Sequence, residues 1–183
     1  MRKRRSPGVS PLVATAIVAS GVGLVVVVSR AGASGPPAAV ICPGQPASAR
    51  ATVDGQSLST AQVANARLIY DTAASLRLPQ RAAVIGIATA MQESRLRNVP
   101  YGTRDSLGLF QQRPSRGWGT PGQVMTPSYA ATVFYGRLVR VSGWQSLPLT
   151  VAAQDVQRSA YPDAYARWEP LATGIASAFG DCE

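Results

Sequence analysis

The sequence predicts a mainly α-helical globular domain that follows an N-terminal apolar segment. Between Ser59 and Phe179 apolar residues recur at helical spacing, and few stretches alternate as a half-buried strand would. Prolines and potential capping residues stand where such helices would begin. We therefore expect a basic and apolar segment over 1–30, a linker rich in Gly, Pro, Ala and Ser over 31–56, and a single domain over 57–183.

The first 30 residues combine a basic cluster with an apolar run. Residues 2–5 are all Arg or Lys, and residues 11–28 form an uncharged, mostly apolar run of 18. At about 1.5 Å per residue this run nearly matches a hydrocarbon core of roughly 30 Å, so it predicts a membrane anchor with the basic end in the cytoplasm. A cleaved signal peptide is the alternative, because residues 31–33 form a plausible cleavage site. Both interpretations place the domain outside the cytoplasm.

The composition excludes several classes of function. The chain carries a net charge of +9, but from residue 31 onward thirteen arginines face nine acidic residues. This moderate bias suits an anionic surface, and the scattered arginines argue against a nucleic-acid partner. The absence of histidine removes Ser-His-Asp and Cys-His triads and His-ligated zinc sites, and there is no glycine-rich phosphate loop. We expect no cofactor, so proton chemistry would fall to carboxylates, tyrosines or hydroxyls.

The two cysteines, Cys42 and Cys182, bracket the whole domain. An exported protein meets an oxidising compartment, so we expect a disulfide between them. Two free thiols in flexible tails are the alternative.

Two helices are expected before the centre of the chain. Residues 59–62, Ser-Thr-Ala-Gln, have the form of a capping box, and helical spacing continues to about Leu76. Pro79 fits the first turn of a second helix that ends near Ser94. Its expected apolar stripe consists of Val84, Ile87, Ala88 and Met91.

Glu93 lies off that stripe, at the end of the second helix. The residues three, four and seven positions before it are Ala90, Thr89 and Gly86, all small. A carboxylate above small side chains can line a cleft without crowding. An ordinary solvated glutamate is the alternative, which the helix dipole slightly disfavours at this end.

The second half of the domain is divided by prolines and glycines. Residues 107–112 are too short for a helix before Pro114, so we expect an extended or hairpin segment that returns beside Glu93. Residues 117–120 continue as an irregular loop. Further helices are expected to begin at Thr126-Pro127, Thr150 and Pro162, and a bend at Pro170 precedes a last apolar segment that ends at Phe179.

Two motifs in the centre of the chain resemble a known family. They are "MQES" over 91–94 and "SLGLFQQ" over 106–112. Together they resemble the lytic transglycosylases and goose-type lysozymes of the lysozyme-like superfamily, and more closely the lysozyme-like domains of actinobacterial envelope proteins. The resemblance implies an α+β lysozyme-like fold with a very small β-hairpin. It also implies cleavage of the MurNAc-GlcNAc β-1,4 bond of peptidoglycan, by an enzyme anchored to the cell membrane or secreted to the cell wall.

The resemblance also implies roles for individual residues. Glu93 would be the catalytic acid, Ser94 would orient it, Gly108 would let a sugar approach the backbone, and Gln111 would bind substrate or the acid. The late Ala-Tyr-Asn of the family reads Ala-Tyr-Pro here, so Tyr161 would substitute only in part. The expected substrate-binding residues are Ser94, Tyr101, Asp105, Ser106, Gly108, Leu109, Phe110, Gln111 and Tyr161.

Glycosidic bond cleavage explains a carboxyl group in such a place. An acid that protonates the leaving oxygen near neutral pH needs a raised pKa, and a semi-apolar pocket of Met91, Leu107, Leu109 and Phe110 would provide it. A lytic transglycosylase then uses the same residue as base and needs no second carboxylate. A muramidase-type hydrolase normally needs one. Asp105 is the only nearby candidate, and a loop residue that binds the backbone of 106–107 is the alternative.

Aromatic and basic residues in the loops complete the expected site. Trp118, Trp144 and Tyr101 are candidates for stacking on sugars, with core packing as the alternative for each tryptophan. Arg104 and Arg113 are candidates for binding lactyl or peptide carboxylates, with simple solvation as the alternative. A non-catalytic wall-binding or scaffold module is the main alternative to an enzyme, and a transport or metal-handling accessory has little support.

Overall fold

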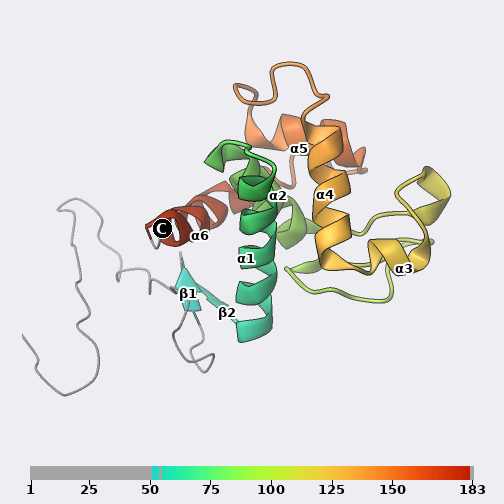
Figure 1. Cartoon of the computed structure of the whole chain (residues 1–183), viewed down its shortest axis with the longest axis horizontal. Helices are drawn as coiled ribbons and strands as arrows, with labels where there is room; N and C mark the ends of the chain where they lie inside the picture. Colours follow the sequence, from blue (N-terminus) through green and yellow to red (C-terminus); the bar gives the residue numbers. More distant parts are fainter. Residues whose placement is uncertain (1–50, 54, 182–183) are drawn as a thin grey trace, which may run out of the picture. The chain divides into compact units, whose positions relative to one another are not determined.

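The computed structural model describes residues 51–53 and 55–181 (Figure 1). These residues form six α-helices, two 3-10 helices and one two-stranded antiparallel sheet, so the predicted mainly helical fold is confirmed. The apolar run over 11–28, Cys42 and Cys182 lie outside the described residues. No helix of the described part is long and apolar enough to cross a bilayer.

A short hairpin precedes the first helix. Strand β1 (Ala51–Val53) pairs with strand β2 (Gln56–Leu58), with Val53 opposite Gln56. Val53 and Leu58 are buried in the hydrophobic core. The predicted linker ran to residue 56, but residues 51–53 and 56 lie in the paired strands, and Val53 packs in the core. Strands of three residues are too short to produce a recognisable alternation, which is why the sequence did not predict them.

The first two helices begin and end close to the predicted residues. Helix α1 (Thr60–Ser75) starts at Ser59, whose backbone N–H and side chain complete the predicted capping box with Gln62. Helix α2 (Gln80–Ser94) follows Pro79. Every residue from 82 to 91 is buried, so α2 is enclosed on all sides and not only along one stripe.

Small residues make this enclosure possible. Helix α2 packs against α1, helix α4 (Pro127–Leu138), helix α5 (Leu149–Gln157) and helix α6 (Glu169–Gly180). A Cβ atom on Gly86 would lie 2.6 Å from Tyr135 Oη and 2.9 Å from Ile69 Cγ2. That tyrosine is itself fully buried and donates a hydrogen bond to the Ile69 carbonyl oxygen (3.0 Å). The glycine and alanines of α2 therefore let larger side chains of α1 and α4 approach its backbone.

The C-terminal elements differ in part from the prediction. Helices α4 and α5 begin within one residue of the expected positions, and a short helix α3 (Pro121–Val124), which was not expected, precedes α4. No regular helix starts at Pro162: turns over 162–165 lead into a 3-10 helix, η2 (Ala166–Trp168). Pro170 lies in the first turn of α6, where a proline needs no hydrogen-bond donor, and it starts that helix instead of bending one.

Candidate active site

The end of α2 is fixed by a sharp change of backbone direction. Arg95 and Leu96 both have positive φ angles of 57°, and Leu96 is fully buried. The Ser94 hydroxyl donates to the Leu109 carbonyl oxygen (2.6 Å) and accepts from the Arg97 N–H (3.2 Å). Ser94 therefore ties the end of α2 to Arg97 and to Leu109. Its hydroxyl is bonded to these residues and not to Glu93.

The segment over 107–112 forms a tight turn, as the sequence predicts. Leu107 and Gln112 exchange two backbone hydrogen bonds of 3.0 Å in an antiparallel bridge. Gly108 has φ +76°, and a Cβ atom on it would collide with the Val124 carbonyl oxygen. The Gln111 side chain donates to the carbonyl oxygens of Tyr101 (3.1 Å) and Gly108 (3.2 Å). In this structure Gly108 and Gln111 thus serve the packing of the turn.

Glu93 is partly buried and is held by a residue from the far end of the chain. The Tyr165 hydroxyl donates a hydrogen bond of 2.7 Å to Glu93 Oε1. Burial raises the pKa of Glu93 above its ordinary value, while hydrogen bonds from Tyr165 and the Gln157 amide oppose this rise. Burial and the neighbouring Glu93 carboxylate also raise the pKa of Tyr165, so this tyrosine stays protonated and donates. The Gln157 amide is positioned by its bond to the Phe110 carbonyl oxygen (2.9 Å).

Glu93 faces a cleft of about 1090 Å³. Of the residues predicted for the site, Glu93, Ser106, Gln111 and Tyr161 line the cleft, whereas Ser94, Tyr101, Asp105, Gly108, Leu109 and Phe110 do not. The residues predicted to form a semi-apolar pocket around Glu93 do not form one. Leu109 and Phe110 are fully buried in the core, and neither Met91 nor Leu107 lines the cleft. The cleft lining instead is rich in arginine: Arg104, Arg113, Arg116, Arg137, Arg140 and Arg158.

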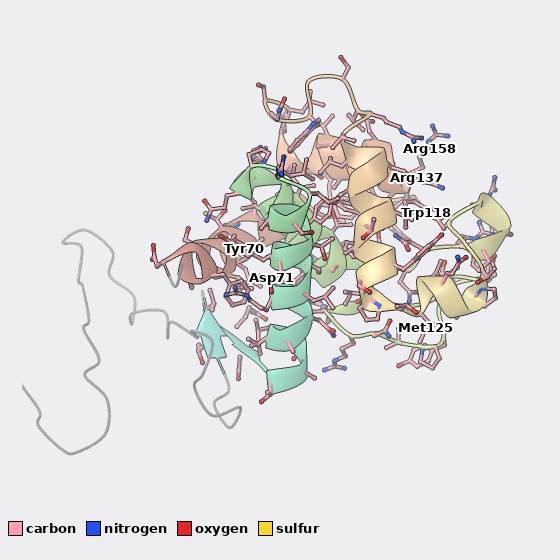
Figure 2. All side chains as sticks on the ribbon, viewed as in Figure 1. Tyr70, Asp71, Trp118, Met125, Arg137 and Arg158 are labelled. Carbon is pink, nitrogen blue, oxygen red and sulfur yellow. The ribbon has the colours of Figure 1, made fainter. Side chains whose placement is uncertain are left out.

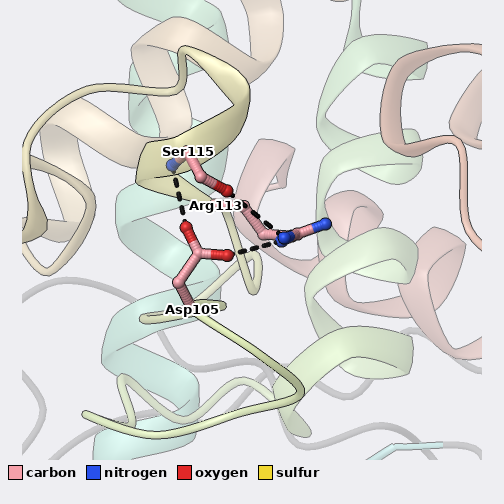
Figure 3. A network of polar contacts seen from close by, with 3 residues as sticks. All are labelled: Asp105, Arg113 and Ser115. Carbon is pink, nitrogen blue, oxygen red and sulfur yellow. Dashed lines mark hydrogen bonds and ion pairs between the residues drawn. The ribbon is translucent and has the colours of Figure 1, made fainter.

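Asp105 is bound within its own loop (Figure 3). Its carboxylate accepts from Arg113 Nε (2.7 Å) and from the Ser115 backbone N–H (2.8 Å). The Ser115 N–H, the Ser115 hydroxyl and the Arg113 guanidinium hold the pKa of Asp105 well below its usual range. Asp105 therefore has the structural loop role that was the alternative to a catalytic carboxylate. Its backbone partner is Ser115, and not residues 106–107 as predicted.

The aromatic candidates have different environments. Tyr161 is 74% exposed and lines the cleft, while Tyr101 is 71% exposed and lies outside it. Trp118 lines the cleft, but it is buried beneath the Arg137 guanidinium, which lies 3.5 Å from the centre of its ring. Trp144 is buried and does not line the cleft, in line with core packing.

Three functional candidates were missed by the sequence analysis: Tyr165, Gln157 and Asp155. Tyr165 lies 72 residues from Glu93 in the chain, and Asp155 and Gln157 come from α5. Nothing in their local sequence connects them to Glu93, because the turns before η2 bring Tyr165 to Glu93 and the packing of α5 brings Asp155 and Gln157 to the cleft. In the described part of the chain, no group of three or more carboxylates could hold a metal ion.

Comparisons of the chain with known protein families and with curated proteins found no match.

The opposite pKa shifts of Glu93 and Asp105 predict opposite effects on stability. The folded chain binds the Glu93 proton more tightly than the unfolded chain, so the stability that this proton contributes is complete below pH 4.5 and is lost as the pH rises through the raised pKa of the folded state. Glu93→Gln removes this loss, and its melting temperature should exceed that of the parent at pH 7, with the difference closing near pH 4.

Asp105→Asn is the matched comparison. The low pKa of Asp105 stabilises the folded chain above pH 3.8 and this contribution fades as the pH falls below that value. The variant should melt below the parent at pH 7, and the gap should narrow in acid. Thermal unfolding followed by circular dichroism from pH 3 to pH 8 measures both. If Glu93→Gln is less stable than the parent at pH 7, the conclusion that burial destabilises the charged form of Glu93 is wrong.

Proposed function

We propose that this chain cleaves peptidoglycan glycan strands at the MurNAc-GlcNAc β-1,4 bond, with Glu93 as general acid and base. The observation that carries the proposal is a partly buried carboxyl group of raised pKa, held by Tyr165 at the edge of a large polar cleft. A carboxyl group in this state keeps a proton available closer to neutral pH than an exposed glutamate does. The proposal includes a lysozyme-like fold, which the resemblance of the 91–94 and 106–112 motifs suggests.

The chemistry needs one acid that works twice. Glu93 gives its proton to the glycosidic oxygen as the C1–O bond of the muramic residue breaks. The resulting carboxylate then takes the proton of the muramic 6-hydroxyl while that oxygen bonds to C1 and closes a 1,6-anhydro ring. Tyr165 keeps the carboxyl group in place through both steps, and its own raised pKa makes it a donor only.

A lytic transglycosylase is the preferred form of this activity. Asp105 is bound to Arg113 and Ser115 and does not line the cleft, so the second carboxylate suggested by the sequence is poorly placed to activate water. Asp155 on α5 does line the cleft and is exposed, which keeps a muramidase-type hydrolase as the second candidate. The proposal places the enzyme outside the cytoplasm, held by residues 11–28 or released into the wall.

Product analysis tests the proposal. Purified wall material is digested with the parent, Asp105→Asn and Asp155→Asn, and the soluble muropeptides are identified by mass spectrometry. We expect anhydro-muropeptides from all three proteins. Reducing ends, together with loss of activity in Asp155→Asn, would indicate a hydrolase. No release of glycan fragments by the parent protein would favour a non-catalytic wall-binding module.

A further inference from the structure

The segment that leads to Tyr165 begins with a serine that is fixed to α5. Arg158, which Figure 2 labels, ends that helix with a φ of +53°, and Ser159 follows it directly. The Gln154 amide nitrogen donates to the Ser159 carbonyl oxygen (2.9 Å), and the Ser159 hydroxyl donates to Gln154 Oε1 (3.1 Å). The Tyr161 N–H donates to the same hydroxyl (3.2 Å). Three hydrogen bonds therefore fix Ser159 at the start of the turns that lead to Tyr165.

The Ser159 hydroxyl is also bonded to the Tyr165 hydroxyl. Burial and the neighbouring Glu93 carboxylate raise the pKa of this tyrosine, and a hydrogen bond from the Ser159 side chain opposes that rise. Tyr165 gives its own hydroxyl proton to Glu93 Oε1 (2.7 Å), so its oxygen can only accept a hydrogen bond from another donor. The single Ser159 hydroxyl proton thus has two acceptors, Gln154 Oε1 and Tyr165 Oη. We call the connection from Ser159 through Tyr165 to Glu93 the hydroxyl chain.

We propose that Ser159 is a positioning residue for Glu93, which donates to the Tyr165 hydroxyl and so strengthens the hydrogen bond that this tyrosine gives to the carboxylate. The inference rests on the proposed function, because Glu93 is the acid and base of that reaction. A hydroxyl group that accepts a hydrogen bond becomes a better donor, by roughly 10–30% per bond. Full burial fixes the ring of Tyr165, and Ser159 fixes the direction of its hydroxyl. Ser159 also lines the cleft, so direct contact with a ligand is the alternative role.

The charged groups around Glu93 do not belong to the hydroxyl chain. Those that share its cleft are Arg104, Arg113 and Arg116 before α3, Arg137 and Arg140 at and just after the end of α4, and Asp155 and Arg158 at the end of α5. Arg95 and Arg167, which come from the end of α2 and from η2, lie over the Trp168 ring and outside the cleft. The side chains that hydrogen-bond Glu93 are Tyr165 and Gln157. An effect of Ser159 on the pKa of Glu93 must therefore pass through Tyr165 or change the exposure of the carboxylate.

The test titrates Glu93 directly, without substrate, in the full chain in detergent. The chain contains three glutamates, Glu93, Glu169 and Glu183, so isotope labelling of glutamate side-chain carboxyl groups gives three signals in nuclear magnetic resonance. The signal that is missing in Glu93→Gln belongs to Glu93. Its change with pH gives the pKa of this group whether or not the protein cleaves anything.

The variants separate the hydroxyl chain from the anchoring of the segment. Ser159→Ala, Tyr165→Phe and the combination of the two are compared with the parent. The matched control is Thr150→Val, which keeps the shape of the side chain. It removes the bond from the Thr150 hydroxyl to the Pro162 carbonyl oxygen (2.5 Å), which ties α5 to the same segment but does not touch Tyr165.

The expected result is a rise in the pKa of Glu93 that depends on Tyr165. Ser159→Ala should raise this pKa by about a quarter of the rise in Tyr165→Phe, because it removes the cooperative part of the tyrosine hydrogen bond. In the Tyr165→Phe background the serine substitution should have no further effect, and Thr150→Val should match the parent. The inference is overturned by no rise in Ser159→Ala, by an equal rise with and without the Tyr165 hydroxyl, or by the same rise in Thr150→Val.

Wall digestion by the same variants separates this inference from the proposed function. In an active enzyme, Ser159→Ala should move the basic limb of the pH–activity profile to higher pH when Tyr165 is present and not when it is replaced by phenylalanine. If the parent digests wall but Ser159→Ala leaves the pKa of Glu93 unchanged, the inference fails while the enzyme stands. If the pKa follows the expected pattern but the parent releases no glycan fragments, the enzyme proposal fails and the hydroxyl chain stands.

Discussion

Glu93→Gln is expected to reduce wall-digesting activity by about 10²–10⁴-fold, the usual contribution of general acid–base catalysis. Glutamine keeps the shape of the side chain and an acceptor for the Tyr165 hydroxyl, but it cannot give or take a proton. Release of soluble muropeptides from purified wall at pH 5–8 measures the loss. Circular dichroism should show an unchanged helical signal, since the substitution removes a partly buried charge and not a packing contact.

Tyr165→Phe separates positioning from proton transfer in the same assay. The tyrosine hydrogen bond lowers the pKa of Glu93, so its removal should raise that pKa further and move the basic limb of the pH–activity profile to higher pH. The loss of activity should be smaller than in Glu93→Gln, because the proton donor remains.

If Glu93→Gln digests wall as fast as the parent, the assignment of Glu93 as the catalytic acid is wrong, and the non-catalytic wall-binding module becomes the better proposal.

The helical part of the fold could be predicted because its signals are local. A capping box at Ser59, prolines at the starts of α2 and α4 and helical spacing between them all lie within a few residues of the helices they define. The hairpin of β1 and β2 was missed because its stability comes from burying Val53 and Leu58 in the core of a domain that the local sequence does not show. The burial of α2 on all sides could not be predicted for the same reason, because it depends on which helices pack against it.

The candidate site divides in the same way. Glu93 could be selected from the sequence because a carboxylate at a helix end among small residues is locally unusual. Its partners Tyr165 and Gln157 could not, because they come from separate elements whose meeting depends on tertiary packing. The sequence also pointed to Tyr161, four residues before Tyr165. Tyr161 lines the cleft, but it is Tyr165 that binds Glu93.

Gly108→Ala is expected to destabilise the domain by about 3 kcal/mol, which corresponds to a fall in melting temperature of roughly 10 °C. Two effects add at this position. A φ of +76° disfavours any residue with a Cβ atom, and the new Cβ would collide with the Val124 carbonyl oxygen and lie 3.2 Å from Asn98 Oδ1. Backbone cannot move aside cheaply here, because the Gly108 N–H is bound to the Val99 carbonyl oxygen (2.8 Å).

Gly117→Ala is the matched control for this prediction. Gly117 has nearly the same φ of +70°, but no atom lies within 4 Å of an added Cβ, so only the backbone strain remains. Its expected destabilisation is about 1 kcal/mol. Thermal unfolding of both variants therefore isolates the collision with Val124. If the two variants are equally stable and Gly108→Ala alone loses wall-digesting activity, then the glycine serves the approach of a sugar to the backbone, as the family resemblance implies, and not the packing of the turn.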